Sequence, residues 1–467
     1  MRADEYISLA LDLGSTRIKI GALDRQARLH LLDACAAPEL SGEGLIRESS
    51  AQAWVEVVEA LLLKHARQGL PLGISSQRSS FLLWERASGR PLTALISWQD
   101  RRALDWCSTH SHLEPLLEQL CGLRLSPHYA GAKLASLFAR QPALRERAAA
   151  GEVLFGTLET WLIWNLTSAH QHVTDLTMAA RTGMLDLESD DWSSELLQAY
   201  AVPGNCLPRL VASKALSIEL VNGLRLSASL ADQSAGALAL LPERAVLANF
   251  GTGAFVLKAG VPAGTRQAGY LTAPLLGGST PLYALEGTIN GAGPSLDDCA
   301  PAPTQLPVDD PSPDAFALPD RAGVGAPHWR PGLGPLFSPA ARSLDPAGRR
   351  RIMLEGLLFR VREILDDLSD GQPPARILLA GGLVRDKALP LGLAALLARP
   401  VEVLEVAEAG LLGMARLAAG MPAYSEIATL SIQPAPQGAY LAAKFPRWQQ
   451  WLQQEFSQPS SLIDSPQ

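Results

Sequence analysis

The sequence reads ISLALDLGSTRIKIGAL over residues 7–23, and this stretch sets the fold that we expect for the chain. Residues 7–13 are a short apolar run leading into Gly14 and Ser15, which is typical of a buried strand that ends in a tight turn. Residues 18–23 predict a second strand. The same order of strand, glycine turn and strand returns at residues 248–258, so we expect two related halves.

Helices and strands alternate along the rest of the chain. Asp345 and Pro346 are a good N-cap and first-turn pair, and the helix predicted after them has one apolar face. Such alternation predicts an α/β fold with ligands at the carboxyl ends of the strands. Further strands are predicted at residues 72–74, 153–156, 224–230 and 377–379, further helices at residues 54–66, 160–166, 234–239 and 389–397, and the apolar face holds Leu354, Leu357, Leu358, Val361, Leu365 and Leu368.

The length and composition are those of a large folded protein. The 467 residues exceed the roughly 250 to 300 at which a single hydrophobic core stops growing, so two domains are expected. Because 47% of the residues are hydrophobic and only 19% are charged, a largely disordered chain is excluded. We expect an N-terminal domain over residues 1–240, a C-terminal domain over residues 241–455, and a tail over residues 456–467.

The charges and cysteines argue against several classes of protein. The 40 basic and 47 acidic residues give a net charge of -7, which disfavours a general nucleic-acid binder. Five widely spaced cysteines fit neither a disulfide framework nor a zinc site, so reduced thiols in the cytoplasm are expected. The N-terminal residues MRADE and the lack of an apolar run of about 18 residues predict neither export nor a membrane span.

Two glycine turns carry groups that suit a phosphate chain. Residues 12–17 (DLGSTR) combine a carboxylate, exposed backbone N–H groups, two hydroxyls and a guanidinium, as binding of phosphate and Mg²⁺ requires. Residues 249–255 (NFGTGAF) offer a similar turn without the acid. Each turn alone could equally be a structural turn or hairpin. Together they could grip a triphosphate from both walls of a cleft.

Asp232 lies between a predicted strand end and a predicted helix of small residues. An aspartate at this place is either the N-cap of the helix or a general base toward a substrate hydroxyl, and its spacing does not decide between them. The proline-rich stretch after Cys299 also allows two interpretations. It is either a flexible linker or an ordered loop packed over a site.

Taken in order, ten segments resemble the FGGY carbohydrate kinases, and the glycerol kinase branch of that family most closely. Their agreement in order over nearly the whole chain carries the resemblance, since no single segment is decisive. The segments are residues 12–21 (DLGSTRIKIG), 73–78 (GISSQR), 97–102 (SWQDRR), 156–167 (GTLETWLIWNLT), 172–185 (HVTDLTMAARTGML), 231–236 (ADQSAG), 250–255 (FGTGAF), 284–293 (ALEGTINGAG), 323–329 (GVGAPHW) and 378–386 (LLAGGLVRD).

This resemblance implies two actin-like, ribonuclease H-like ATPase domains that close on ATP in the cleft between them. It implies that Mg²⁺ binds at Asp12 and that Asp232 is the catalytic base. A carboxylate of modest basicity is sufficient to accept the hydroxyl proton in phosphoryl transfer. The nucleotide-binding residues that it implies are Gly14, Ser15, Thr16 and Arg17 in the first turn, Gly251, Thr252 and Gly253 in the second, and Gly293, Gly381 and Gly382. The substrate-binding residues that it implies are Gln77, Arg78, Ser79, Trp98, His128, Asp232, Gln233 and Phe255.

Four positions depart from the family pattern. Ser79 and His128 stand where glycerol kinases have Glu and Tyr, and Ser136 and Ser338 stand where the family commonly has Trp and Gly. Loss of a carboxylate that accepts hydroxyl hydrogen bonds costs about 1.5 to 3 kcal/mol for a ligand built around that acid. These departures favour a larger or different polyol, a ketose, or weak use of glycerol.

The expected activity is therefore ATP-dependent phosphorylation of a hydroxyl on a small sugar or polyol. A ketose kinase similar to xylulokinases is the alternative within the family. A non-catalytic actin-like scaffold that binds nucleotide is the alternative from another class. We expect no nucleic-acid partner and no membrane partner, and by analogy with the family a homo-oligomer is possible.

Overall fold

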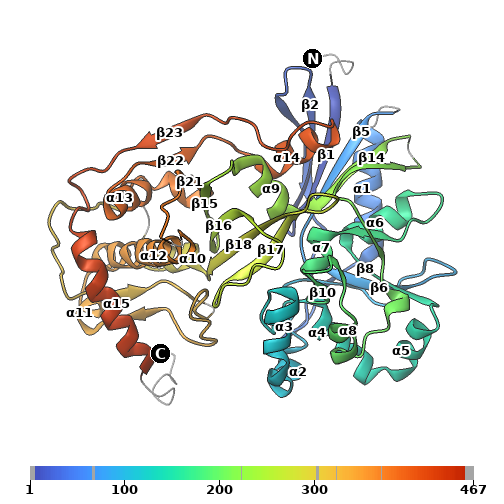
Figure 1. Ribbon diagram of the computed structural model, residues 1–467, viewed down its shortest axis with the longest axis horizontal. Coiled ribbons are helices and arrows are strands. Elements are labelled where there is room, and N and C mark those ends of the chain that lie inside the picture. Colours follow the sequence, from blue (N-terminus) through green and yellow to red (C-terminus); the bar gives the residue numbers. More distant parts are fainter. Residues whose placement is uncertain are drawn as a thin grey trace.

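The computed structural model describes residues 6–65, 69–221, 223–300, 304–321, 323–369 and 371–457, and it contains two large mixed sheets (Figure 1). In the first sheet, β1 runs parallel to β5 and β5 runs parallel to β14, so these three strands end at the same edge. The strand order is β13 (Lys214–Glu219), β14 (Arg225–Ala231), β5 (Pro71–Ser76), β1 (Tyr6–Leu13), β2 (Arg17–Asp24) and β3 (Leu29–Ala36).

Alternating side chains of β1 build a separate core on each face of the first sheet. Leu9, Leu11 and Leu13 pack with helices α1 (Ala51–His65) and α6 (Leu158–Leu166). Ala10, on the opposite face, packs with α14 (Ala409–Ala418). The strands and helices predicted in this half are confirmed in type, while Ala66, the last residue of one predicted helix, lies outside the described residues.

Helix α14 comes from the late part of the chain but lies against the first sheet, beside β1 and α9 (Asp232–Leu240) (Figure 1). A Cβ on Gly73 would lie 2.6 Å from the backbone oxygen of Met414, and a Cβ on Gly413 would lie 2.5 Å from that of Ala235. These two glycines let the backbone of α14 approach β5 and α9 closely. The chain therefore crosses back to its first half near the end.

The second sheet repeats the scheme, with β15 parallel to β21 and β21 parallel to β22. Its order is β17 (Leu271–Leu276), β18 (Leu282–Ile289), β16 (Ala254–Val261), β15 (Ala245–Phe250), β21 (Arg376–Ala380), β22 (Val401–Leu404) and β23 (Thr429–Ile432). One face is covered by α10 (Ala292–Asp297), α12 (Pro346–Ser369), α13 (Ala388–Leu397) and α15 (Leu441–Ser457).

Helix α12 confirms the apolar face predicted from the sequence. Its backbone begins as expected, because the N–H of Gly348 donates to Asp345 Oδ1 at 2.8 Å. The six predicted apolar residues of this helix are all buried. Helix α15 is joined to it by a buried ion pair, in which Lys444 Nζ lies 2.7 Å from Glu355 Oε2. Since α15 continues to Ser457, the helix includes the first two residues of the predicted tail, and residues 458–467 lie outside the described part.

The described part of the proline-rich segment is an ordered loop. Leu306 and Leu318 are buried, and Asp310 Oδ1 lies 3.2 Å from Lys444 Nζ on α15. The loop thus packs on the helices of the second half and not over the cleft described below. Pro301 and Pro303 lie outside the described residues.

Smaller elements complete the first half. A four-stranded sheet consists of β4 (Glu48–Ser49), β7 (Leu95–Ile96), β6 (Phe81–Glu85) and β8 (Val153–Thr157). The helices beside it are α2 (Leu104–Thr109), α3 (Glu114–Cys121), α4 (Ala130–Arg140), α5 (Pro142–Ala149) and α8 (Ser194–Ala199). The short elements elsewhere are β9 (Val173–Asp175), α7 (Leu176–Ala180), β10 (Leu185–Asp186), β11 (Asp191–Trp192), β12 (Arg209–Val211), β19 (Ala317–Leu318), β20 (Leu336–Phe337) and α11 (Pro339–Arg342).

Two expectations from composition can be compared with the described residues. All five cysteines are free thiols, as expected from their spacing. Within the described ranges, no helix combines the length and the apolar character that crossing a membrane requires.

Candidate active site

The parallel strands of the first sheet deliver three charged residues to one edge. Asp12 lies near the end of β1, Arg78 follows the end of β5, and Asp232 follows the end of β14. The register aligns these ends, because Asp12 pairs with Ser75 and Ala231 pairs with Ser76. Side chains far apart in sequence therefore meet at the carboxyl edge, as expected for an α/β sheet.

A cleft of about 720 Å³ opens at this edge and is lined by both halves of the molecule. Its lining comes from the end of β1 and from α9, from β15, β16 and β21, and from the segment 403–410, which leads from β22 into α14. Seven of the predicted site residues line it: Asp12, Gly14, Asp232, Gln233, Phe255, Gly381 and Gly382.

Two carboxylates, Asp12 and Asp232, line the cleft, and the charge of Asp232 disfavours ionisation of Asp12. Burial, followed by the charge of Asp232, raises the pKa of Asp12 to about 6, although Ser75 Oγ donates to Asp12 Oδ1 at 2.9 Å. Burial also raises the pKa of Asp232, and the nearby Arg78 partly offsets that rise. Such a pair is costly for the fold and is suited to a cationic or proton-donating ligand.

Replacing Asp12 with asparagine is therefore expected to raise the melting temperature at pH 8 and to change it little at pH 4. The unfolded chain loses the Asp12 proton near the ordinary pKa of 3.8, whereas the folded protein holds it up to about pH 6. The wild type thus loses stability as the pH rises through 6, and the variant does not. Calorimetry at pH 4, 6 and 8 checks this, with the exposed Asp366→Asn as the control. A difference in melting temperature that is equal at pH 4 and pH 8 would contradict the expectation.

The rest of the first glycine turn lies near the cleft in different ways. Thr16 and Arg17 are exposed at the start of β2. Lys19, two residues further along the same strand, pairs with Asp12 in the strand register. Its Nζ lies 2.7 Å from Oε2 of Glu408, which lines the cleft. Lys19 and Glu408 were not predicted as site residues from the sequence, which indicated Arg17 as the cation of this turn.

The second glycine turn meets two other predicted glycines. The N–H of Gly293 donates to the backbone oxygen of Thr252 at 3.2 Å, and a Cβ on Gly293 would lie 2.8 Å from the oxygen of Gly251. Gly381 has a φ of +97°, and a Cβ there would lie 2.2 Å from the oxygen of Phe250. The β15–β16 turn, the start of α10 and the end of β21 therefore converge closely. Gly251 and Thr252 are exposed at this convergence, and Gly253 is half-buried.

A buried arginine pair lies beside Asp232. Arg78 Nε is 3.9 Å from Asp232 Oδ1, and Arg78 Nη1 is 3.7 Å from Glu286 Oε2. Arg181 forms a closer ion pair with the same Glu286 oxygen. Burial raises the pKa of Glu286, but the charges of Arg181 and Arg78 together hold it below its ordinary value. Glu286 is thus ionised and bridges the two guanidinium groups.

Ser79 is enclosed immediately beside this pair. Its side chain is fully buried, and its Oγ donates to the backbone oxygen of Arg181 at 2.8 Å. The residue also has a φ of +64°, which few residues other than glycine adopt. Its hydroxyl therefore already has a partner within the protein.

The rings of Trp98 and His128 pack against each other at a tilt of 56°, with centroids 5.5 Å apart. The segment that carries Trp98 is fixed by Lys133, whose buried Nζ donates to the oxygen of Ser97 at 2.7 Å. Burial, followed by the charges of Lys133 and the arginine pair, lowers the pKa of His128 well below its ordinary value. His128 is therefore neutral at pH 7.

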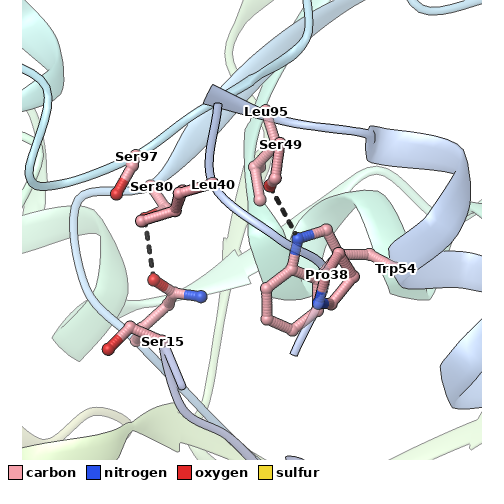
Figure 2. Close-up of a pocket in the computed structure, with 9 residues that line it drawn as sticks. Ser15, Pro38, Leu40, Ser49, Trp54, Ser80, Leu95 and Ser97 are labelled. Carbon is pink, nitrogen blue, oxygen red and sulfur yellow. Dashed lines mark hydrogen bonds between the residues drawn. The ribbon is translucent and has the colours of Figure 1, made fainter. Parts of the chain in front are cut away.

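A second, small cavity connects the first glycine turn with the residues after β5. Its volume is about 10 Å³, room for one water molecule, and its lining includes Ser15, Gln77, Ser80 and Ser97 (Figure 2). Ser80 Oγ donates to Gln77 Oε1 at 3.1 Å and accepts the N–H of Trp98 at 3.0 Å. Ser15 and Gln77 thus border this cavity and are not among the residues that line the larger cleft.

Arg181 and Glu286 were also missed as site residues in the sequence. One signal could have identified Glu286, because it stands alone as a charge in the otherwise apolar strand LYALEGTI. A buried glutamate is rare unless it is paired, so this position calls for a cation from elsewhere in the fold. No comparable local signal marks Arg181.

Comparisons with known proteins agree with this architecture. The FGGY family of carbohydrate kinases matches twice, its N-terminal domain over residues 7–231 and its C-terminal domain over residues 246–421. A glycerol kinase from Shewanella amazonensis is 30% identical over 416 residues, which are 83% of this chain and 84% of that protein. A glycerol kinase from Bordetella parapertussis is 31% identical over 457 residues, 90% of this chain and 89% of that protein.

Solved structures share the fold at lower identity. The crystal structure of Plasmodium falciparum glycerol kinase with ADP has a TM-score of 0.80 at 19% identity and covers 97% of this chain and 99% of its own. That of xylulose kinase from Rhodospirillum rubrum has a TM-score of 0.80 at 18% identity and covers 96% and 99%. The predicted α/β fold is thereby confirmed. Given the two domain matches and the full-length relatives, the chain belongs to the FGGY family of carbohydrate kinases.

Proposed function

We propose that this protein transfers the γ-phosphate of ATP to a hydroxyl group of a small sugar or polyol. One observation carries the proposal: Asp232 lies in a cleft shared by both halves, beside Asp12 and opposite the glycine turn at the end of β21. A nucleotide phosphate chain held across this cleft would place its end near a carboxylate that can accept a hydroxyl proton. Family membership favours the same chemistry.

The two glycine turns are the proposed binding site of the phosphate chain. Backbone N–H groups at residues 14–17 and 251–253 would donate to phosphate oxygens, with the hydroxyls of Ser15, Thr16 and Thr252 as further donors. Gly293, Gly381 and Gly382 would line the nucleotide, since close backbone approaches at Gly293 and Gly381 leave no room for a side chain. Arg17 is a further candidate from the sequence. Lys19 is added because it lies opposite Asp12.

The residues present fit a magnesium ion brought in with ATP. Asp12 offers a hard oxygen ligand, and burial followed by the charge of Asp232 raises its pKa, an effect that a bound cation would offset. Among the described residues no cluster of three acidic, histidine or cysteine ligands is present, which suits an ion held by one carboxylate, phosphate oxygens and water. When bound, the ion would neutralise charge on the phosphates.

Asp232 is the proposed general base. Phosphoryl transfer passes through a loose transition state, so alignment and charge neutralisation supply most of the catalysis. A carboxylate of modest basicity is sufficient to take the hydroxyl proton as the new P–O bond forms. Burial raises the pKa of Asp232, and the charge of Arg78, with Nε at 3.9 Å, partly offsets that rise.

The acceptor is proposed to bind between Asp232 and the aromatic pair Trp98 and His128. Arg78, Gln233 and Phe255 are the remaining side chains proposed around it, with Gln77 behind them. Because Ser79 donates to a backbone oxygen and is fully buried, its hydroxyl offers little to an acceptor. The acceptor pocket therefore differs from that of the glycerol kinases, which favours a different polyol or a ketose.

A ketose kinase is the second candidate. The fold does not separate the two, because solved glycerol and xylulose kinases resemble the chain with the same TM-score of 0.80. The presence of Asp12 and Asp232 in one cleft argues against the alternative that the protein is a non-catalytic scaffold. From composition we further propose that the protein has no nucleic-acid or membrane partner and that it is cytoplasmic. By analogy with the family we propose that it can form a homo-oligomer.

A coupled assay of ADP release across matched acceptors tests the proposed function. The panel contains glycerol, erythritol, ribitol, xylulose and ribulose, each with Mg²⁺ and ATP, and product formation is confirmed by ³¹P NMR. We expect at least one polyol or ketose to be phosphorylated with a higher kcat/KM than glycerol. ATP binding without any phosphorylated product would favour the scaffold, and glycerol as the best substrate would show that the altered pocket keeps the glycerol kinase preference.

A further inference from the structure

A second buried carboxylate, Asp175, lies behind the catalytic edge. It ends β9 and caps α7, and its side chain is fully buried. Its oxygens accept the backbone N–H groups of Thr177 at 3.1 Å and Met178 at 3.0 Å. No basic side chain contacts it by an ion pair within the described ranges, so hydrogen bonds alone satisfy this acid.

Thr177 connects this acid to the base proposed for catalysis. Thr177 Oγ1 donates to the carboxylate of Asp175 at 2.9 Å and accepts the N–H of Ala231 at 2.8 Å. Ala231 is the last residue of β14 and the N-cap of α9, and Asp232 follows it directly. Ala231 has no polar side chain with which to cap the helix, so Thr177 fixes this junction from outside.

Ser213 connects the same acid to the second half of the molecule. Ser213 Oγ donates to Asp175 Oδ2 at 2.6 Å and accepts the N–H of Gly277 at 2.7 Å. Gly277 directly follows β17, the edge strand of the second sheet, and its oxygen accepts the N–H of Ser213 at 3.2 Å. Asp175 therefore bonds, through one hydroxyl on each side, to the Asp232 junction and to the second sheet.

We propose that Asp175 and Thr177 are positioning residues that fix the β14–α9 junction, and with it the carboxylate of Asp232, relative to the second sheet. The inference rests on the proposed function of Asp232. Neither residue contacts the cleft, and both act through the Ala231 N–H. Since the second sheet carries one wall of the cleft, this chain of hydrogen bonds sets the distance between base and phosphate. A displacement of about 1 Å at a reacting group can reduce turnover about 100-fold.

Thr177→Val tests the inference, because valine keeps the shape of threonine and removes the hydroxyl. We expect kcat to fall about 10- to 100-fold, with the KM for ATP nearly unchanged. Thr177→Ser keeps the hydroxyl and should restore most of the activity. Hydrogen exchange of the segment 226–236 supplies a measurement that does not depend on activity, and we expect faster exchange in Thr177→Val.

Thr174→Val is the matched control. Thr174 is also buried, and its Oγ1 donates at 2.7 Å to a different buried acid, Glu159. It should lose similar stability yet keep kcat and the exchange of the segment 226–236. If Thr177→Val kept the wild-type kcat and the wild-type exchange rates, the inference would be overturned. The proposed function would still stand in that case, provided that Asp232→Asn is inactive. An active Asp232→Asn would overturn the proposed role of Asp232 as the base, and the exchange measurement would then decide whether Thr177 fixes the β14–α9 junction.

Discussion

Replacing Asp232 with asparagine is expected to lower kcat for acceptor phosphorylation by about 100- to 10,000-fold, while ATP still binds. Asparagine keeps the size of the side chain and can accept the N–H of Gln233, which Asp232 Oδ1 accepts at 2.8 Å. It removes the negative charge and with it the capacity to take a proton. Steady-state kinetics together with calorimetric ATP titration would measure the two effects separately.

The Asp232→Asn variant should also be at least as stable as the wild type. Burial raises the pKa of Asp232, so its charge costs folding free energy at neutral pH, and the neutral amide removes that cost. A higher melting temperature with lost turnover would exclude misfolding as the cause. The exposed Asp366→Asn on α12 is the control for the substitution itself. Turnover near the wild-type level in Asp232→Asn would exclude Asp232 as the base.

The glycine turns and their flanking strands could be predicted from the sequence because their signals are local. An apolar run, a small-residue turn and a second run identify β1 and β2, and the same pattern identifies β15 and β16. The sequence left Asp232 open between a helix cap and a base. In the structure Ala231 is the N-cap of α9, Asp232 is the first residue of the helix, and its carboxylate lines the cleft.

The arginine pair and the glutamate that bridges it could not be predicted, because these three residues come from separate parts of the chain. Arg78 follows β5, Arg181 follows α7, and Glu286 lies on β18 of the second sheet. Only the closure of both halves brings them together. The same reason applies to α14, whose residues show ordinary helical spacing but not which sheet they cover. Its position depends on Gly73 and Gly413, whose role appears only when two backbones meet.

The arginine pair also explains how the acceptor side can tolerate serine at position 79. Glu286 supplies the negative charge that holds Arg78 and Arg181, and Ser79 supplies a hydrogen bond to the Arg181 backbone. The site thus keeps both guanidinium groups in place without an acid directly after Arg78. A carboxylate that pairs with Arg78 thus comes from the second half of the molecule, so the proposed acceptor site depends on groups from both halves.

Glu286→Gln is accordingly expected to destabilise the protein and to weaken acceptor binding together. Removing one partner from a buried ion pair costs about 3 to 5 kcal/mol, since the remaining charges stay buried without compensation. For a domain of this size each kcal/mol lowers the melting temperature by about 2 to 4 °C, so a fall of about 6 to 20 °C is expected. The KM for the acceptor should rise, because Arg78 loses one of the two carboxylates that hold it. Calorimetry and acceptor titrations at saturating ATP check both effects.

Two further variants decide whether the charge of Glu286 is responsible. Glu402→Gln breaks a half-exposed ion pair with Arg376 on the same sheet and should cost less than about 1 kcal/mol, because water screens that pair. Glu286→Asp keeps the charge on a shorter side chain and should recover part of the stability. If Glu286→Gln matched Glu402→Gln in stability and left the acceptor KM unchanged, Glu286 would not be the residue that holds the two arginines. The coupling between the halves would then have to run through their other contacts, among them the Ser213 to Gly277 hydrogen bonds and the Lys19 to Glu408 ion pair.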